Sequence, residues 1–358
     1  MLSRRTFVAA AVPALASTVG AADDTTAKGP IRTGLLNTQH GHLDGKMKAM
    51  LNSPDYKVVC ASEPDPATRR KRQAQPDFRD LRWVSEDQLL GDPSIQLVVV
   101  EPGEGVVVAE AMGYGRKVID AGKHLHLEKP PTNRMQPFRE LVEQARRRNL
   151  LLQMGYIWRF HEGITAAIEA ARQGWLGDVY MLRGTINTDL TAEARLPLVQ
   201  YHVDMMLELG CHIIDRVVDL WGRPTNVRSW LRHDTPFDDK LPDNTLAVLE
   251  YEKAMALVVC SASMPGHNEH RSFELIGTDG LMLIQPVEPG NGMRVCLRKA
   301  RGPYKAGWQE IRFPDQTRFV NDFKELARAI KTGKPLRYSY DHELLVHETI
   351  LRASAAPG

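Results

Sequence analysis

The stretch "GLLNTQHGH" (residues 34–42) decides how the first half of the chain folds. It follows an apolar run that begins at Ile31, and it precedes a helical pattern over 42–52. A parallel sheet that binds a dinucleotide has a glycine-rich turn at this place, where the first glycine makes the tight turn and the second admits the pyrophosphate. Almost none of those glycines is present here. The stretch therefore predicts a strand–turn–helix unit and leaves its ligand open.

Short apolar runs alternate with helical patterns from Ile31 to about Gly155. We expect strands at 31–36, 56–62, 96–101, 124–128 and 150–155, and helices at 42–52, 66–75, 105–121 and 134–148. This alternation predicts a parallel sheet that is covered on both faces. The continuous run "QLVVVEP" (96–102) is typical of a strand buried on both sides.

The pattern changes after Gly155. Helices are expected near 162–173, 204–220, 317–331 and 341–353, and strands at 178–187, 225–232, 244–252, 255–263, 271–277 and 294–298. Longer period-two stretches of this kind predict one large open, mostly antiparallel sheet. We therefore predict an α/β Rossmann-type parallel-sheet domain over 30–155. It is followed by an α+β substrate and oligomerisation domain over 156–358, whose last helix packs back on the first domain.

The N-terminal residues 1–22 have the pattern of a twin-arginine signal peptide. Arg4 and Arg5 precede an apolar, alanine-rich run from Val8 to Val19, which is too short for a permanent membrane span. The alternative is a basic N-terminus on a cytosolic protein. The pattern favours export to the periplasm or the medium.

The charge balance argues against nucleic acid as a partner. The chain has 46 Lys and Arg residues against 44 Asp and Glu, and removal of 1–22 takes away Arg4 and Arg5 alone among its charged residues. The mature protein is thus near neutral. The basic run Arg69–Arg72 is expected on a solvated helix face. The four cysteines follow no metal-ligand spacing, and we assign no metal site.

The segment "AGKHLHLEKPPT" (121–132) places Lys129 at the carboxyl end of a strand, where a ligand of the sheet would lie. Pro130 fixes the turn that follows. A lysine that is partly desolvated, or close to another cation, has a lowered pKa and exchanges protons with a substrate hydroxyl. The alternative is a strand-end lysine that pairs with Glu128.

The segment "YHVDMMLELGCHIIDRVVDLWG" (201–222) contains a second cluster of titratable residues. Glu208, His212 and Asp215 are spaced four and three apart, so they project from one helix face. An imidazole oriented by a carboxylate suits proton transfer. Two alternatives stay open: a histidine held by Asp215 in an interdomain packing face, and a metal site, for which Glu208 and His212 alone do not complete a shell.

Three ordered motifs resemble the glucose–fructose oxidoreductase, inositol dehydrogenase and rhizopine-catabolism family (Gfo/Idh/MocA) of two-domain nicotinamide enzymes. They are "AGKHLHLEKPPT", "GYIWRFHEGITAAIEAARQGWLGDV" (155–179) and "LELGCHIIDRVVDLWG" (207–222), and the resemblance covers nearly all of 31–350. It implies that Lys129 and His212 are the catalytic pair. Glu208 stands where the family has a substrate-binding aspartate. Trp158, Arg159 and His161, just after the strand near 150–155, are expected in the substrate cleft.

The turn after the first strand departs from the family's Gly-x-Gly-x-x-Gly. Asn37 and Gln39 replace the first two glycines, and His42 replaces the third unless Gly41 serves. Asn37 tolerates the left-handed backbone of the tight turn, whereas Gln39 would crowd a phosphate. Histidines at a helix N-terminus could donate to an anion. The residues assigned to the cofactor are Asn37, Thr38, Gln39, His40, Gly41, His42, Glu63, Glu101 and Glu128.

Two acidic residues bear on the choice of cofactor. Glu63, at the end of the second strand, would accept from the adenosine ribose hydroxyls and repel a 2′-phosphate, so NAD is expected rather than NADP. The alternative is a surface carboxylate in a turn. Glu101 lies before Pro102, where the family has a small or hydroxylated residue, and a carboxylate there argues against ordinary binding.

The resemblance implies an exported NAD-type oxidoreductase that acts on a CH–OH group of a sugar or cyclitol. One alternative is a cofactor-free carbohydrate-binding protein on the same fold. Another is a glycoside-cleaving enzyme that recycles bound NAD. Apolar stretches such as "TLAVLEY" (245–251) would cover both faces of the second sheet, so a homodimer or homotetramer is expected.

Overall fold

The computed structural model describes residues 29–315 and 317–354. The predicted signal peptide at 1–22 lies outside these residues. Within the described range, no helix is long and apolar enough to cross a membrane.

The first domain is built on a six-stranded parallel sheet in the order β3-β2-β1-β4-β5-β6, which confirms the predicted fold class. The strand order reverses between β1 and β4, so ligands are expected beside the carboxyl ends of these strands. The strands are β1 (Ile31–Thr38), β2 (Tyr56–Ser62), β3 (Arg82–Trp83), β4 (Leu97–Glu101), β5 (His124–Leu127) and β6 (Leu152–Met154). Every residue of β4 is buried, as expected for a central strand.

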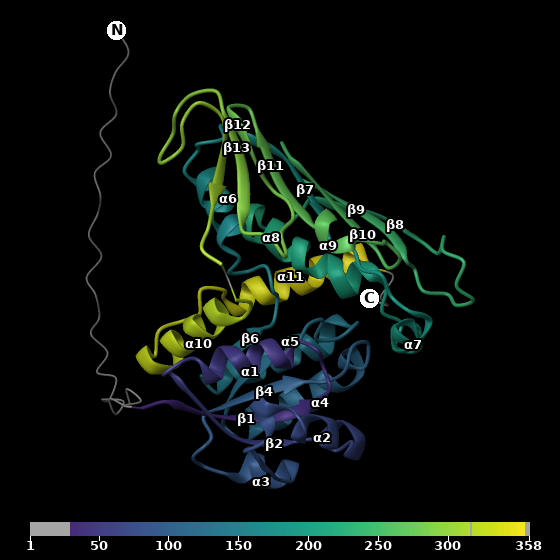
Figure 1. The fold of residues 1–358 in the computed structure, drawn as a ribbon, viewed down its shortest axis with the longest axis vertical. Helices are drawn as coiled ribbons and strands as arrows, with labels where there is room; N and C mark the ends of the chain where they lie inside the picture. The colour runs from purple at the N-terminus through teal and green to yellow at the C-terminus, as the bar shows by residue number, and fades with distance from the viewer. Residues whose placement is uncertain (1–28, 316, 355–358) are drawn as a thin grey trace, which may run out of the picture.

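Helices cover both faces of this sheet (Figure 1). They are α1 (Leu43–Leu51), α2 (Pro66–Gln73), α3 (Glu86–Gly91), α4 (Val107–Asp120) and α5 (Met135–Arg147), with a 3-10 turn η1 at Pro76–Phe78. Local signals set their starts. The Asp65 side chain accepts from the Thr68 amide at the start of α2, where Pro66 needs no partner for its nitrogen. A capping box between Ser85 and Gln88 starts α3.

The second domain is built on an eight-stranded sheet in the order β14-β13-β12-β11-β7-β10-β9-β8. Only β7 and β10 pair in parallel. The strands are β7 (Val179–Thr185), β8 (Asn226–Arg232), β9 (Asn244–Glu250), β10 (Met255–Ser261), β11 (Ser272–Gly277), β12 (Gly280–Ile284), β13 (Gly292–Leu297) and β14 (Gly307–Arg312). The helical segments are α6 (Glu162–Arg172), α7 (Ala192–Gln200), the π-helical turn η2 (Met206–Gly210), α8 (Cys211–Trp221), α9 (His267–His270), α10 (Val320–Thr332) and α11 (Tyr340–Ala353).

The C-terminal helices join the two domains. The helix α10 packs on α1, and Phe319, Phe323 and Leu326 enter the apolar cluster that covers β1. The last helix, α11, lies between α5 of the first domain and α8 of the second, in yellow at the centre of Figure 1. This arrangement agrees with the predicted return of the chain to the first domain.

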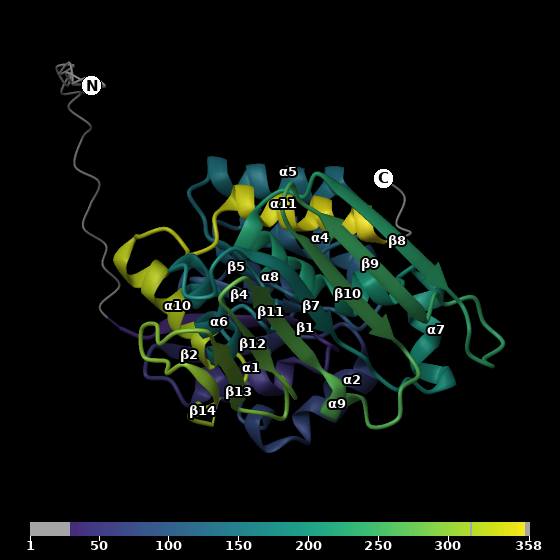
Figure 2. The ribbon, with the colours of Figure 1, turned by 90° about the horizontal axis from the view of Figure 1, so that it is seen from above.

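The eight-stranded sheet has one covered and one open face. α6, α8 and η2 pack on its inner face. Side chains of β9 and β10 alternate between buried and half-buried positions, so the second face retains partial solvent contact. In the described part of the chain no helix lies across this outer face (Figure 2). All four cysteines are free thiols.

Candidate active site

A cavity of about 150 Å³ lies between the two domains. Its first-domain wall comes from the turn after β1 and from Lys129, just after β5. The second-domain wall comes from η2, α8 and the segment before β11. The polar residues that line it include His40, His42, Lys129, Glu208, His212 and Arg271. The structure thus brings together both predicted catalytic residues and Glu208.

Lys129 is paired with Glu208, and not with Glu128 as the alternative had it. Its Nζ donates to Oε1 of Glu208 at 2.5 Å and to the Glu208 carbonyl at 3.0 Å. Burial lowers the pKa of Lys129, but the charge and hydrogen bond of Glu208 together with the neighbouring Cys211 and Glu128 outweigh it, and the net shift is upward. The expected lowering of the lysine pKa is therefore wrong. Lys129 keeps its charge at neutral pH and has one N–H left for a ligand.

Glu208 is the group in the cavity that titrates near neutral pH. Burial raises its pKa to about 7, although the Lys129 charge opposes the shift. Its Oε2 is buried and has no partner within the described residues. The π-helical turn η2 that carries Glu208 was not expected, because the sequence pattern reads as one continuous helix over 204–220. Such turns are frequent at functional sites.

His212 lies in the cavity as a neutral imidazole. Burial lowers its pKa well below the usual value, and the charge of Lys129 lowers it further. Its Nδ1 is buried without a partner in the part of the chain that the structure describes. The alternative in which Asp215 holds this ring is wrong, because Asp215 is occupied by Arg159 and Arg216.

Arg159 and Trp158 are not cleft residues. The guanidinium of Arg159 is buried between Asp215 and Glu343 and bonds both carboxylates, joining α8 to α11. Trp158 is fully buried in the main apolar cluster. Both lie after β6, where the sequence pattern gives no direction for a side chain. We conclude that both residues serve interdomain packing.

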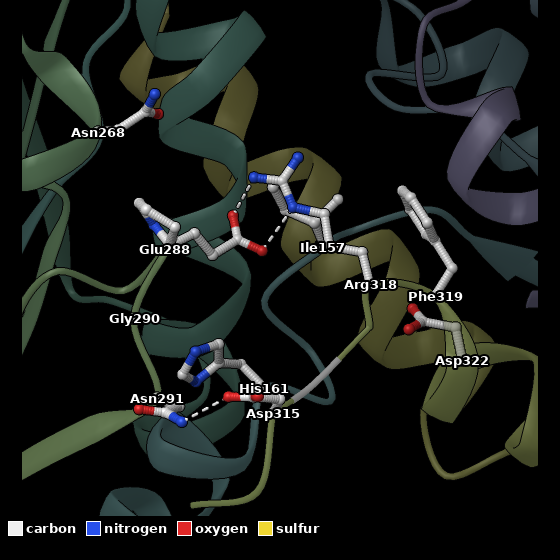
Figure 3. Close-up of a pocket in the computed structure, with 11 residues that line it drawn as sticks. Ile157, His161, Asn268, Glu288, Gly290, Asn291, Asp315, Arg318, Phe319 and Asp322 are labelled. Atoms are coloured by element: carbon white, nitrogen blue, oxygen red, sulfur yellow. Dashed lines mark hydrogen bonds and ion pairs between the residues drawn. The ribbon is translucent and has the colours of Figure 1, made fainter. Parts of the chain in front are cut away.

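His161 lines a second cavity of about 520 Å³ rather than the first. Its ring caps α6, and its Nε2 contacts the Val287 carbonyl at 2.9 Å. Figure 3 shows this cavity, where Arg318 lies over Glu288 and is paired with it. The two cavities share Ile157 and Arg318. A substituent on a ligand in the first cavity would therefore extend toward the second.

The turn after β1 is closed by hydrogen bonds within the chain. Asn37 has φ 57°, which confirms its predicted left-handed conformation. The amides of Gln39 and His40 both donate to the Glu101 carbonyl, at 3.0 and 3.2 Å. Glu63 accepts from the amide and the hydroxyl of Thr38 at 2.6 and 2.9 Å. The side chain predicted to bind a ribose thus points into the turn.

A buried cluster of three charged residues lies beneath the turn. Lys46 of α1 bonds Glu101 at 2.6 Å and also pairs with Glu128, and all three side chains are fully buried. Burial raises the pKa of Glu101 to about 8, Lys46 opposes the shift, and Glu128 adds to it. Glu101 is therefore mostly protonated at neutral pH, and Lys46 is left to neutralise Glu128. The sequence pattern does not reveal the role of Lys46, because a single lysine in a short helix is expected at the surface.

Arg72 corrects the reading of the basic run at 69–72. Its side chain is buried and donates to the carbonyls of Thr38 and His40 at 2.7 and 2.9 Å. It also pairs with Asp44 in the first turn of α1. The helix α2 therefore contributes one residue of the run to the turn rather than to a solvated face.

His40, His42 and Glu128 are the group best placed to hold a metal ion within the described residues. One ligand atom of each lies within 4.8 Å of the others. Hydrogen bonds already join them, since the His42 amide donates to Nδ1 of His40 and Nδ1 of His42 lies 3.2 Å from Oε1 of Glu128. Burial lowers the pKa of both histidines, so both imidazoles are neutral. A neutral imidazole can ligate a metal ion, but it does not attract a phosphate as a cation would.

Two family models match the chain and together span most of both domains. Residues 41–156 match the oxidoreductase family with an NAD-binding Rossmann fold, and residues 164–283 match the C-terminal domain of GFO/IDH/MocA proteins. The chain belongs to the Gfo/Idh/MocA oxidoreductase family. This confirms the resemblance seen in the sequence motifs.

Several Gfo/Idh/MocA relatives have a named activity. The chain is 25% identical to the NADP(+)-type scyllo-inositol 2-dehydrogenase of Bacillus subtilis over 67% of its own length and 65% of that protein. It is 25% identical to the NAD(+)-type enzyme of the same organism over 78% and 80% of the two chains. An uncharacterised oxidoreductase of Schizosaccharomyces pombe is 27% identical over 78% and 76%.

Solved Gfo/Idh/MocA structures share the fold of this chain. Levoglucosan dehydrogenase, solved with NADH and levoglucosan, superposes with a TM-score of 0.75 at 16% identity, over 90% of this chain and 96% of that one. GenD2 from gentamicin A biosynthesis, solved with NAD, gives 0.74 at 19% identity, over 96% of each chain. At these identities the likeness establishes the fold alone.

The cofactor class of the family is a nicotinamide dinucleotide, and the turn of this chain fits it at a cost. A pyrophosphate would take the amides of Gln39 and His40 from the Glu101 carbonyl. A hydrogen bond to a neutral acceptor contributes about 0.5–1.5 kcal/mol and one to a charged acceptor about 1.5–3 kcal/mol, so the exchange is favourable for an anion. The residues that would hold the dinucleotide are therefore those of the turn. The affinity for the dinucleotide is reduced, because the hydrogen bonds from Gln39 and His40 to the Glu101 carbonyl must first break.

Proposed function

We propose that this chain is an NAD(P)-dependent dehydrogenase that oxidises a CH–OH group of a sugar or cyclitol, or reduces the matching ketone. The observation that carries the proposal is the cluster of Lys129, Glu208 and His212 in one cavity, at the carboxyl end of the family's NAD-binding sheet. Relatives with a named activity are dehydrogenases and reductases. These comparisons do not favour a carbohydrate-binding protein or a glycoside-cleaving enzyme.

The three residues have separate roles in this proposal. When bound, a nicotinamide dinucleotide supplies the hydride acceptor. Lys129 stays protonated and donates to the substrate oxygen, which stabilises the alkoxide as it forms. Glu208, with a pKa of about 7, takes the hydroxyl proton. His212 is a neutral hydrogen-bond partner for a second hydroxyl of the substrate and so fixes the orientation of the sugar or cyclitol ring.

A substrate screen tests the proposal. Purified protein is incubated with NAD or NADP and a panel of sugars and cyclitols, and the reduced cofactor is read by its absorbance. We expect turnover with a subset of the panel that falls roughly 10²–10⁴-fold in Lys129→Ala and in Glu208→Gln, whereas His212→Ala should mainly raise the KM for the sugar. Lys48→Ala, an exposed lysine of α1, is the matched control and should keep full activity. Unchanged turnover in Lys129→Ala would contradict the assignment.

The preference for NAD over NADP and the export of the protein belong to the same proposal. Glu63 bonds Thr38 inside the turn in this structure, so the preference for NAD requires that its carboxylate turns outward, where it would repel a 2′-phosphate. The Arg4–Arg5 pattern supports export through the twin-arginine route, which carries folded proteins. Fractionation of the native host, with Arg4→Lys and Arg5→Lys together as the variant, tests export. Equal distribution of both forms would contradict it.

A further inference from the structure

Arg271 brings a positive charge to the active-site cavity that the chain neutralises only weakly. The residue precedes β11, and its side chain is 11% exposed. Its Nη1 lies 3.7 Å from Oε2 of Glu288, and its Nη2 donates to the Asn187 carbonyl at 3.4 Å. Its Nε is buried and has no partner among the residues that the structure describes. Each contact is long for a guanidinium, whose charge-assisted bonds are usually 2.7–2.9 Å.

The carboxylate nearest to Arg271 is committed to another arginine. Glu288 accepts from Nε of Arg318 at 2.6 Å and from its Nη2, and Figure 3 shows this forked pair in the larger cavity. Two guanidiniums therefore share one carboxylate. Burial lowers the pKa of Arg271, the Glu288 charge offsets this only in part, and Arg318 lowers it further. The surroundings favour an additional anion at Arg271.

The other acidic residues of the cavity do not supply that anion. Glu208 is bound to Lys129, and Glu104 is exposed to solvent. A buried charge without a full partner is costly, and proteins keep one where a ligand completes it. The planar fork of an arginine matches a carboxylate or a phosphate through two parallel hydrogen bonds. A ligand in this cavity would meet Lys129 from one wall and Arg271 from another.

We propose that the substrate of this chain is a negatively charged carbohydrate, whose carboxylate or phosphate ester pairs with Arg271 while the reacting hydroxyl lies at Lys129. The proposal rests on the proposed function, because it names the substrate class of the same cavity. A cavity of about 150 Å³ suits one sugar ring. A larger substituent elsewhere on the ring would extend past Arg318 into the neighbouring 520 Å³ cavity.

Binding measured without turnover tests this proposal. The purified protein, with and without saturating NAD, is titrated by intrinsic fluorescence with matched pairs. These are D-glucuronate and D-glucose, D-galacturonate and D-galactose, and D-glucose 6-phosphate and D-glucose. We expect the anionic member of at least one pair to bind roughly tenfold or more tightly. A preference for the uronates identifies a carboxylate, and a preference for the ester identifies a phosphate.

The variants separate recognition from folding. Arg271→Met should remove the preference, Arg271→Lys should retain part of it, and Arg294→Met, an exposed arginine of β13, should leave it unchanged. Because the native partners of Arg271 are weak, Arg271→Met should keep the melting temperature of the ligand-free protein. Equal affinity within every pair, or a preference that survives in Arg271→Met, would overturn the proposal. Binding that depends on Arg271 in a protein that never reduces NAD would instead refute only the dehydrogenase function.

Discussion

At the scale of single residues, the ionisation of Glu208 controls the proposed chemistry. Lys129 stays charged and His212 stays neutral across the physiological range, because the shifts in their pKa values carry both away from neutral pH. Glu208 alone of the three has a pKa near 7. The carboxylate must be ionised to accept a proton in the oxidative direction.

The pH dependence of oxidation follows from this pKa. We expect kcat/KM to rise with pH, with a midpoint near 7, and to level off about one pH unit higher, since the ionised fraction of Glu208 rises in that window. Glu208→Gln should lower kcat roughly 10²–10⁴-fold and remove the limb near pH 7. A pH–rate profile of both proteins is the measurement. A limb that persists in Glu208→Gln would assign the proton transfer to another group.

Motif resemblance predicted which residues meet in the site, but not their charges. Lys129, Glu208 and His212 were placed together correctly, because their motifs are specific to the family. The predicted lowering of the Lys129 pKa was wrong, because Lys129 pairs with Glu208, and the two residues belong to motifs that lie far apart in sequence. Lys46, Arg72 and Arg271 were missed because charged residues are expected at the surface, and only tertiary packing reveals their burial.

At the scale of elements, the turn between β1 and α1 determines the affinity for the dinucleotide. The Gln39 side chain lies against Gly103, whose added Cβ would meet Oε1 of Gln39 at 3.0 Å. It therefore fills the space between the β1 and β4 loops. The backbone amide of Gln39 donates to the Glu101 carbonyl.

Removal of the Gln39 side chain should tighten dinucleotide binding. We expect Gln39→Gly to lower the Kd for NAD, because the change clears the approach to the backbone amides. Gln173→Gly, at the exposed end of α6, is the matched control and should leave the Kd unchanged. Calorimetric titration of the three proteins gives the comparison. Weaker binding in Gln39→Gly would show that the side chain supports the turn instead of crowding it.

A second feature at this scale is the pair of buried salt bridges by which Arg159 joins α8 to α11. Removal of one partner from a buried ion pair costs about 3–5 kcal/mol, whereas an exposed pair contributes about 0–1 kcal/mol. Arg159→Met should therefore lower the free energy of unfolding by roughly the larger amount. Arg172→Met, which breaks a half-exposed pair with Asp219, should lower it by less than about 1 kcal/mol. If denaturant titrations gave equal losses of unfolding free energy for Arg159→Met and Arg172→Met, the stabilising role of the buried salt bridges would be contradicted.

Long periodic elements were predicted well and short ones were not. The strand expected at 56–62 is β2 (Tyr56–Ser62), and the helix expected at 341–353 is α11 (Tyr340–Ala353). The two-residue strand β3 and the six-residue helix α3 are too short to show a period. The helix α7 contains Pro197 and lacks an apolar stripe, so its pattern does not indicate a helix.

At the scale of the whole molecule, the open face of the second sheet presents apolar side chains that we expect another subunit to cover. Trp230, Leu246 and Val259 pair across β8, β9 and β10 and form an apolar row on this face. Trp230 is 52% exposed. Contiguous apolar surface of this kind is uncommon on soluble monomers.

Light scattering at micromolar concentration should give a dimeric or tetrameric mass. Trp230→Arg combined with Leu246→Arg should shift the protein toward the monomer, because it buries two charges in the contact. Leu51→Arg, an equally exposed apolar residue on α1, is the control and should not change the mass. A monomeric wild type would refute the prediction.

Transfer of deuterium from substrate to cofactor tests whether this chain is a dehydrogenase. The protein is incubated with NAD and a panel of carbon-deuterated sugars, sugar acids and cyclitols, and the dinucleotide is then analysed by mass spectrometry. We expect deuterated NADH with at least one substrate, in amounts reduced roughly 10²–10⁴-fold in Lys129→Ala. Absence of label across the panel, in a protein shown by titration to bind both NAD and the sugar, would contradict the assignment of this chain as a dehydrogenase.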